Sequence, residues 1–513
     1  VIAPGFIATP MTDVLDDGQK ESLLGRVPMG RLFDGLDSEG TTPLAVYGDI
    51  NGKPDFRGRT IAKVVLNRRL DDDTVQVRLL HGARNLPEIG WIRPDEDHGS
   101  FFQLRRQEDA VQELLQARAL LHQLHGPSAI KGIRARWRGV GDHLKGRSAG
   151  IVKDMLSSEP FYALHGPPGT GKTTVASVAV AAHLRSDRSQ RVLISSQSHF
   201  ALDNLAVRVL ARCRDDNMDI VAVRIASDHA VAEKKVHPRL EALRPERQAS
   251  AKVDGIKRAC RAALDDGQLQ DGRQLDAGMK ALLGEWMEQA PRVELEVQDR
   301  IRRGANLVFA TTGGCTEQNV ATGGTAGLYD WVVVEEAARA WPTELALPLV
   351  RGLRWTLIGD HFQLPAFDEL SVQRFLQLCS QTEDEELQLH GTRAKEYQEV
   401  FRLFGSLFDN RAQRREARPK TARLIEPLDE LDLQFRMHPD ICRLVSRAFY
   451  RERVDPDNGE LTTYQDGWLR TDEETTAQPH LFTHPGFLKN RALVWLDTQG
   501  VEDTNDQRAW KNE

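Results

Sequence analysis

A glycine-rich loop constrains the fold of this chain more than any other feature of its sequence. The loop Gly166–Thr174, GPPGTGKTT, follows the apolar stretch FYALH and precedes the helix-forming stretch TVASVAVAAHL. This is the phosphate-binding pattern G-x-x-x-x-G-K-[ST] in the strand, loop and helix order that it requires. Glycines let backbone N–H groups cradle phosphate oxygens, and a helix N-terminus favours negative charge. The expected phosphate ligands are Gly166, Pro167, Gly169, Thr170, Gly171, Lys172, Thr173 and Thr174.

Around this loop, short apolar stretches alternate with helical ones. The expected strands are FYALH, RVLISS, NLVFATT, DWVVVEE and WTLIGD. Such alternation predicts an α/β fold with a parallel sheet covered by helices on both faces. Residues 213–304 predict a charged, largely helical insertion, and a second α/β unit is expected from about Leu431 through the apolar stretch 492–497.

The N-terminal part of the chain differs in composition and in its pattern of apolar residues. Residues 1–58 are rich in Gly, Pro and Asp and predict irregular structure. TIAKVVL and TVQVRLL flank Asp71–Asp73 and predict a β-hairpin, which GWIRP extends to a small β unit. Apolar residues at helical spacing over 103–124 predict a helix that Gly126 and Pro127 end.

Two expected strands end in acidic residues that suit phosphate chemistry. Trp331–Glu335 is followed by Glu336, so Glu335 is expected to hold a metal ion with Thr173, and Glu336 to polarise the attacking water. Asp360 and Gln363 follow the next expected strand and could sense the γ-phosphate and its water. An acidic strand end facing solvent and an ordinary turn are the alternative interpretations.

Basic residues supply the remaining expected catalytic groups. Lys172 can reach the β- and γ-phosphates. Arg436, in LQFRMHP, could reach across from the second α/β unit as an arginine finger, although a surface arginine is the default interpretation of such a residue.

Taken in order, these motifs resemble those of superfamily 1 helicases, and most of all the UPF-type branch of the nonsense-mediated-decay helicase. GPPGTGKTT resembles motif I, EEAA motif II, GDHFQLP motif III, and QFRMHP a motif characteristic of that branch. The resemblance covers residues 150–500. It implies tandem RecA-like P-loop NTPase domains with ATP and Mg²⁺ between them, and a single strand of nucleic acid across their top.

The resemblance also implies contacts with nucleic acid and a division into regions. SSQSHFALDN is similar to motif Ia and ATT to motif Ic, which implies strand contacts at Ser196, Gln197, His199, Thr311 and Thr312. The implied regions are an irregular region at 1–58, a small β-barrel-like unit at 59–100, a helical stalk at 101–155, a first RecA-like domain at 156–367 that holds the insertion, and a partial second domain at 368–513.

The sequence departs from the branch's pattern at four points. Glu335 stands where motif II usually has Asp, and Ala366 stands where a second proline commonly ends motif III. The adenine-reading Gln of the branch is not evident in GRSAGIVKDML. Motifs V and VI are unmatched and are expected beyond residue 513, so the chain is expected to be incomplete.

Charge and cysteine usage limit the classes of partner. A net charge of −7 excludes coating of nucleic acid by bulk charge, so contacts would need local basic patches. Residues 131–147, where Trp137 could stack on a base, and residues 411–423 are candidate patches, each of which could instead be a solvated face. Five scattered cysteines without a CxxC pair disfavour a zinc ribbon and suit a reducing, cytoplasmic or nuclear location. No apolar run is long enough for a membrane span.

The sequence thus leaves two functions open. The first is an ATP-dependent helicase or translocase on single-stranded RNA or DNA, moving 5′ to 3′ as its branch implies. The second is an ATP-gated nucleic-acid-binding module or scaffold, with protein partners in a larger complex and no unwinding.

Overall fold

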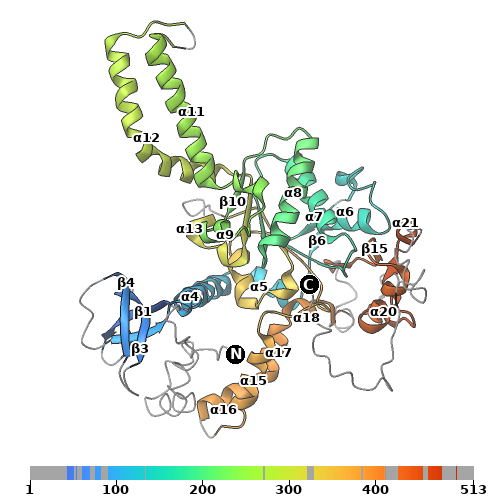
Figure 1. The fold of residues 1–513 in the computed structure, drawn as a ribbon. Helices are drawn as coiled ribbons and strands as arrows, with labels where there is room; N and C mark the ends of the chain where they lie inside the picture. The colour runs from blue at the N-terminus through green and yellow to red at the C-terminus, as the bar shows by residue number, and fades with distance from the viewer. Residues whose placement is uncertain are drawn as a thin grey trace, which may run out of the picture. The chain divides into compact units, whose positions relative to one another are not determined.

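The computed structural model describes residues 43–50, 53–54, 61–69, 75–82, 90–132, 134–269, 272–320, 328–382, 385–409, 411, 426–454, 460–476 and 493 (Figure 1). The chain divides into two compact units, Val1–Gln112 and Glu113–Glu513. The expected strand at 492–497 and most of the candidate patch at 411–423 lie outside the described residues.

The N-terminal unit is built on an antiparallel sheet in the order β2-β1-β3-β4, with β5 paired to β1. Its strands are β1 (Pro43–Ile50), β2 (Lys53–Pro54), β3 (Ala62–Arg69), β4 (Val75–Gly82) and β5 (Gly90–Pro94). The predicted hairpin is therefore confirmed as β3 and β4. Irregular structure over 1–58 is wrong for β1 and β2, because Leu44 and Val46 bury their side chains against Ala62 and Val64. Closure of these strands into a barrel stays a prediction.

The helix expected over 103–124 is present as two helices, α4 (Asp95–Gln116) and α5 (Arg118–His125). They meet at Ala117, whose backbone is not helical, with φ −85° and ψ 52°. The apolar spacing continues across this break, so no local pattern predicts it.

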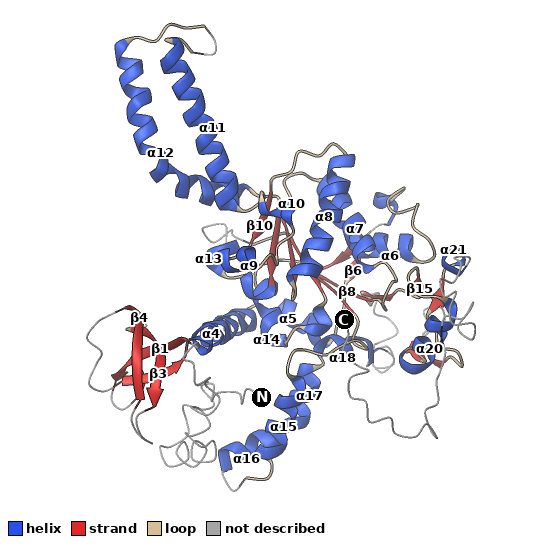
Figure 2. Ribbon diagram, in the orientation of Figure 1, coloured by secondary structure: helices blue, strands red, loops and turns tan. Residues whose placement is uncertain are grey.

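The larger unit contains a seven-stranded parallel sheet in the order β10-β11-β9-β12-β13-β8-β14 (Figure 2). Its strands are β8 (Phe161–His165), β9 (Val192–Ser196), β10 (Ala222–Ile225), β11 (Leu307–Thr311), β12 (Trp331–Glu335), β13 (Trp355–Gly359) and β14 (Leu428–Glu430). All five predicted strands are present. The central strands β8, β9, β12 and β13 are buried at every position, so both faces of the sheet are covered, as expected for a parallel sheet.

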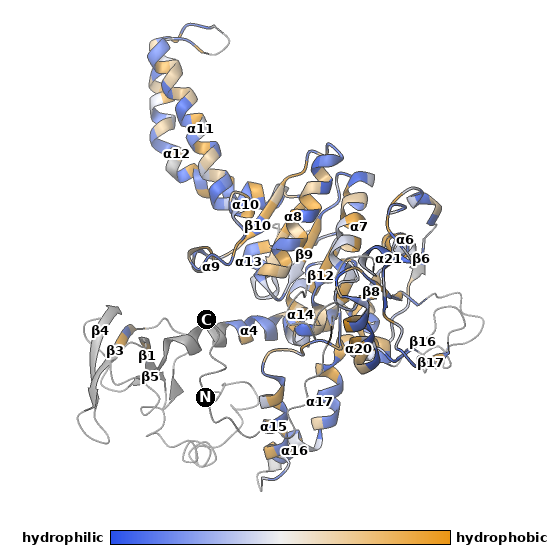
Figure 3. Ribbon diagram, turned by 45° about the vertical axis from the view of Figure 1, so that its right-hand side comes forward, coloured by the Kyte–Doolittle hydropathy of each residue, from blue (hydrophilic) through white to orange (hydrophobic). Residues whose placement is uncertain are grey.

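Helices and short segments surround this sheet. The helices are α6 (Ser148–Ser157), α7 (Lys172–Ser186), α8 (His199–Asp215), α9 (Asp228–Ala232), α10 (Pro238–Glu241), α13 (Glu317–Val320) and α14 (Pro342–Leu349). Three 3₁₀ turns span Arg134–Trp137, Thr312–Gly314 and Ala337–Arg339, and β6 (Ile130–Lys131) pairs with β7 (Ser158–Glu159). Figure 3 shows the sheet strands as mainly hydrophobic, in agreement with the core that they share with α7 and α8.

The predicted insertion contains two long helices, α11 (Pro245–Asp266) and α12 (Ala277–Gly304), which pack side by side (Figure 1). Their surfaces mix polar and apolar residues, and Leu282 and Leu295 are exposed. The predicted bounds of the insertion, 213–304, include Ala222–Ile225, which instead forms β10 of the main sheet. The sequence does not predict this strand because it is four residues long and includes the charged Arg224.

Residues after β13 first form four helices, α15 (Glu369–Cys379), α16 (Glu385–Thr392), α17 (Ala394–Phe401) and α18 (Leu403–Asp409). The chain then returns to the main sheet, where β14 pairs with β8. This pairing places Leu428–Glu430 with the phosphate-loop sheet, whereas the sequence resemblance implies a second domain from residue 368 onward. The exact division into domains stays a prediction.

The last described segment builds a small cluster of its own. It contains β15 (Leu433–Gln434), α20 (Pro439–Phe449), β16 (Glu452–Val454), β17 (Leu461–Thr463), β18 (Arg470–Thr471) and α21 (Glu473–Thr476). Its core joins Cys442, Tyr450, Trp468 and Leu469. No helix in the described part of the chain has both the length and the apolarity that a membrane crossing demands.

Candidate functional site

The phosphate loop leaves the carboxyl end of β8 and leads into α7, as the motif predicted. Gly169 and Gly171 have positive φ angles of 78° and 84°, which glycine adopts without strain. A Cβ at Gly166 would lie 2.5 Å from Lys172 Cγ, so the loop closes tightly around the lysine side chain. Lys172 Nζ donates a hydrogen bond to the carbonyl oxygen of Gly166 at 2.6 Å, and Thr170 Oγ1 donates to that of Pro167 at 2.8 Å. The ammonium group therefore lies on the loop itself.

A candidate metal position lies between α7 and β12. Thr173 Oγ1 donates to Glu335 Oε1 at 2.6 Å, and the Glu335 side chain is buried. Burial raises the pKa of Glu335 to about 7, with a further contribution from the charge of Glu336. Glu335 Oε2 is also buried and has no hydrogen-bond partner among the described residues. A hydroxyl beside a carboxylate oxygen that lacks a partner is an oxygen donor set that suits a hard divalent cation.

Glu336 directly follows this strand and is half-buried in a left-handed backbone conformation, with φ 57° and ψ 34°. Such a conformation costs a residue with a side chain roughly 1–3 kcal/mol and is concentrated at functional sites. This strained backbone belongs to Glu336, the residue that is predicted to polarise the attacking water.

Asp360 and Gln363 follow β13 and bond to each other. The Asp360 carboxylate is 1% exposed and accepts hydrogen bonds from His165 Nε2, the Phe362 N–H, Gln363 Nε2 and the Tyr450 hydroxyl. Although burial opposes ionisation, the hydrogen bonds from His165, Gln363 and Tyr450 lower the pKa of Asp360. A carboxylate that already has four donors is poorly placed to bind a nucleotide, and the geometry favours a positioning role over the predicted direct contact.

The segment that carries Arg436 packs directly on the phosphate loop. The Phe435 N–H donates to the Gly169 carbonyl oxygen at 2.9 Å, and a Cβ at Gly169 would lie 2.7 Å from Arg436 Cβ. Gln434 Oε1 fixes the turn by accepting from the backbone N–H groups of Arg436 and Met437. Arg436 is exposed, and no carboxylate in the described part of the chain forms an ion pair with it. The structure thus brings Arg436 to the loop and leaves its guanidinium available.

The residues expected to contact nucleic acid gather at the carboxyl edge of the sheet, but several are buried. Ser196 and Thr311 lie side by side at the ends of β9 and β11. The Gln197 amide accepts from Thr312 Oγ1 at 2.5 Å and donates to Glu344 Oε2 at 2.9 Å. Ser196 and Thr312 are nearly inaccessible to solvent. Their shared location is as predicted, whereas direct contact with a strand stays a prediction.

His199 lies at the start of α8 and contacts Arg224 Nη2 at 2.9 Å through its Nδ1 atom. Burial and the neighbouring guanidinium lower the pKa of His199. The half-buried imidazole is therefore held against Arg224 of β10, a strand that the sequence did not predict.

The basic stretch 131–147 is largely neutralised within the fold. Arg134 pairs with Asp154, Lys145 with Asp472 and Glu474, and Arg147 with Asp429. Trp137 is buried in the main core. The suggestion that it stacks on a base is therefore wrong, because its ring packs inside the domain.

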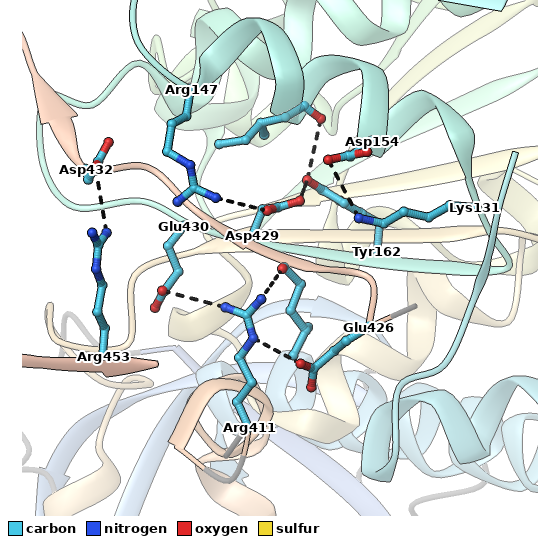
Figure 4. A network of polar contacts seen from close by, with 12 residues as sticks. Lys131, Arg147, Asp154, Tyr162, Arg411, Glu426, Asp429, Glu430, Asp432 and Arg453 are labelled. Atoms are coloured by element: carbon cyan, nitrogen blue, oxygen red, sulfur yellow. Dashed lines mark hydrogen bonds and ion pairs between the residues drawn. The ribbon is translucent and has the colours of Figure 1, made fainter. Parts of the chain in front are cut away.

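The second candidate patch is described only at Arg411. Its guanidinium is buried and donates from Nε to Glu426 Oε2 at 3.0 Å, with Glu430 also nearby (Figure 4). Arg411 therefore pairs with buried carboxylates inside the domain. The rest of 411–423 lies outside the described residues.

The structure also places residues at the site that the motifs did not indicate. Arg208, on α8, donates to the hydroxyl of Thr174 in the loop motif at 3.2 Å. His165 and Tyr450 both reach Asp360. The sequence signal that could have indicated Arg208 is its position on α8, the helix that directly follows β9.

Comparisons with known proteins show which sequences this chain resembles. Residues 143–367 match the family model described as the AAA domain. Probable helicase senataxin of Mus musculus is 24% identical over 386 residues, which cover 64% of this chain and 13% of that protein. DNA-binding protein SMUBP-2 of Mus musculus is 28% identical over 218 residues, covering 42% and 21%. Regulator of nonsense transcripts 1 homolog of Arabidopsis thaliana is 23% identical over 402 residues, covering 77% and 26%. This chain thus spans about an eighth to a quarter of the length of these relatives.

Proposed function

We propose that this chain, which is similar in sequence to helicases of the UPF type, is an ATP-dependent helicase or translocase on single-stranded nucleic acid, moving 5′ to 3′. The observation that carries this proposal is the packing of Phe435 and Arg436 on Gly169. That contact puts a cation from a distant segment beside the phosphate loop, which is the arrangement needed to couple hydrolysis to movement between two parts of a chain.

The proposed nucleotide position follows from the side chains around the loop. The loop amides and Lys172 would bind the phosphates of ATP, and Thr173 with Glu335 would hold Mg²⁺. Bound Mg²⁺ would supply charge neutralisation between the phosphates. Glu336 would orient the attacking water and accept its proton, and Gln363 would sense the γ-phosphate. Arg436 would stabilise charge on the transferred phosphoryl group, a contribution of roughly 10³–10⁵ in rate in related chemistry.

The polar ends of β9 and β11 support the proposed strand position. Ser196, Gln197, Thr311 and Thr312 lie at the same sheet edge as the loop, where open parallel sheets bind ligands. Since such contacts go largely to phosphates and stacked bases, RNA and DNA both fit the proposal. Five free cysteines accord with the proposed location in the cytoplasm or nucleus.

A second candidate is an ATP-gated binding module or scaffold without unwinding. The specific observation in its favour is Glu335, which is one methylene longer than the Asp usual at this position and whose Oε1 accepts the Thr173 hydroxyl at 2.6 Å. A metal ligand displaced by the longer side chain would slow hydrolysis while still permitting nucleotide binding.

One experiment separates these functions. The purified protein is assayed for ATP hydrolysis and duplex unwinding with single-stranded RNA or DNA present, beside Lys172→Ala. We expect stimulated hydrolysis and unwinding that the substitution abolishes. Binding of ATP without unwinding or stimulation would support the scaffold, and turnover by Lys172→Ala close to that of the wild type would exclude the proposed site.

A further inference from the structure

On the basis of the proposed ATP hydrolysis, we infer that Asp360, His165 and Tyr450 form a positioning joint that couples the loop after β13 to the segment carrying Arg436. Asp360 directly follows β13, His165 ends β8, and Tyr450 directly follows α20. The three side chains are 0–2% exposed. None is required to touch a nucleotide, and each acts through the residues that it holds.

The acceptor positions of Asp360 show what the joint connects. Oδ1 accepts from His165 Nε2 at 3.0 Å and from the Phe362 N–H at 3.2 Å. Oδ2 accepts from Gln363 Nε2 at 2.7 Å and from the Tyr450 hydroxyl at 2.8 Å. Because Gln363 and Tyr450 share one oxygen, movement of the Gln363 amide towards a phosphate changes the bond that Tyr450 makes.

Tyr450 belongs to the same small cluster as Arg436. Its ring packs against Trp468, with centroids 5.4 Å apart, and edge-on against Phe362 at 5.3 Å. The segment is also attached at its other end, where Phe435 bonds to Gly169. Its contacts with the phosphate-loop sheet thus include one on the loop, one on Asp360, and the Trp468 ring edge-on against His165, with centroids 5.7 Å apart.

His165 makes the joint rigid from the sheet side. It immediately precedes Gly166, and its Nδ1 lies 3.5 Å from Glu430 Oε1, an ion-pair distance. Glu430 belongs to β14 and is held in turn by Arg411 at 3.7 Å (Figure 4). Although burial opposes protonation, the bonds to Asp360 and Glu430 raise the pKa of His165. Because carboxylates lie on both sides of the imidazole, we expect its ring to keep its orientation when Gln363 moves. The hydrogen bond that changes is then the one between Tyr450 and Asp360.

The chain supplies a matched control for Tyr450. Tyr162 of β8 is also buried, and its hydroxyl donates to Asp429 Oδ2 at 2.7 Å. Tyr450→Phe and Tyr162→Phe each remove one buried hydroxyl that bonds to a carboxylate. We therefore expect similar losses of thermal stability, whereas only Tyr450→Phe disturbs the joint.

The test measures kcat and KM for ATP with saturating single-stranded DNA or RNA, together with hydrogen exchange of α20 on addition of a non-hydrolysable ATP analogue. Tyr450→Phe should lower the strand-stimulated kcat about tenfold, since a hydrogen bond to a charged group is involved, and leave KM within about twofold. The analogue should change exchange in α20 of the wild type and of Tyr162→Phe, but not of Tyr450→Phe.

Each other outcome counts against a specific claim. A Tyr450→Phe protein that matches Tyr162→Phe in kcat and in exchange would overturn the joint while leaving the proposed function in place. A wild-type protein that binds the analogue with no change in α20 would also overturn the joint. A wild-type protein that binds no nucleotide would overturn both proposals.

Discussion

Thr173 and Glu335, 162 positions apart in the chain, share a hydrogen bond of 2.6 Å where α7 begins and β12 ends. The contact joins the hydroxyl of the phosphate loop to a carboxylate that is one methylene longer than the aspartate usual in this motif. The free oxygen of Glu335 remains buried beside them. These two residues therefore define where a divalent cation would have to lie.

Glu335→Asp tests whether the longer side chain is simply accommodated. If Glu335 reaches the same water-bridged Mg²⁺ position, the aspartate variant should hydrolyse ATP at the same rate or faster. Steady-state kinetics over a range of Mg²⁺ concentrations measures this. A large loss of activity would mean that the site is built around the longer residue.

Glu336→Gln should still bind ATP but trap it unhydrolysed, because the amide cannot accept a proton from water. Affinity for a single strand should then stay at its ATP-state value. Nucleotide binding by fluorescence and single-turnover hydrolysis distinguish the steps. Equal loss of both would indicate a structural or metal-binding role for Glu336.

Arg436→Ala should cost about 10³-fold in the strand-stimulated kcat, since the guanidinium would no longer offset charge on the phosphoryl group. Arg443→Ala is its control, because Arg443 is an exposed residue of α20 whose ion-pair partner among the described residues is Asp440, three positions earlier. The control should be within twofold of the wild type. Should both variants behave alike, Arg436 would lose its catalytic assignment.

Arg208→Ala should raise KM for ATP about fivefold with little change in kcat, because Arg208 bonds to Thr174 at the start of α7. Arg212, one turn further along α8, makes an equivalent bond to Ser177 Oγ at 3.1 Å. Arg212→Ala therefore reports on helix packing alone. Equal changes in KM for the two variants would show that Arg208 acts only through packing.

His183 predicts a pH dependence of stability. It packs edge-on against Trp331, and burial, together with the charge of Arg354, lowers its pKa to about 4. The unfolded chain takes up a proton near pH 6.5 and the folded chain only near 4, so stability falls as pH decreases between these values. The loss attributable to His183 is at most roughly 3 kcal/mol.

Thermal unfolding from pH 7.5 to 4 measures this loss. His183→Gln should flatten the decline, whereas substitution of the exposed His143 by Gln should leave it parallel to the wild type. A decline that is unchanged in His183→Gln would assign the pH dependence to other groups.

The sequence predicted the central strands and the phosphate loop because their signals are local. Runs such as Trp331–Val334 are continuously apolar, and the loop motif fixes both its neighbours. β14 gave no such signal, because Asp429 and Glu430 are acidic. They are buried only through partners brought from elsewhere in the chain, namely Tyr162, His165 and Arg411.

The candidate site was predictable as a set of residues, but not as a set of contacts. Order along the chain identified Lys172, Glu335 and Arg436, and the structure brings all three to one loop. It could not show that Asp360 is saturated by four donors, since His165 and Tyr450 carry no motif of their own. Nor could it show that Trp137 is buried, because a tryptophan flanked by arginines can lie in a core or on a surface with the same local sequence.

The two helices α11 and α12 occupy one crossover of the sheet. β10 ends at Ile225 and β11 begins at Leu307, yet the two strands are direct parallel neighbours. A parallel crossover needs a dozen or so residues at least. Beyond that minimum, the entropic cost of closing the connection rises only slowly with its length. We therefore expect changes of length between α11 and α12 to leave the register of β10 and β11 unchanged.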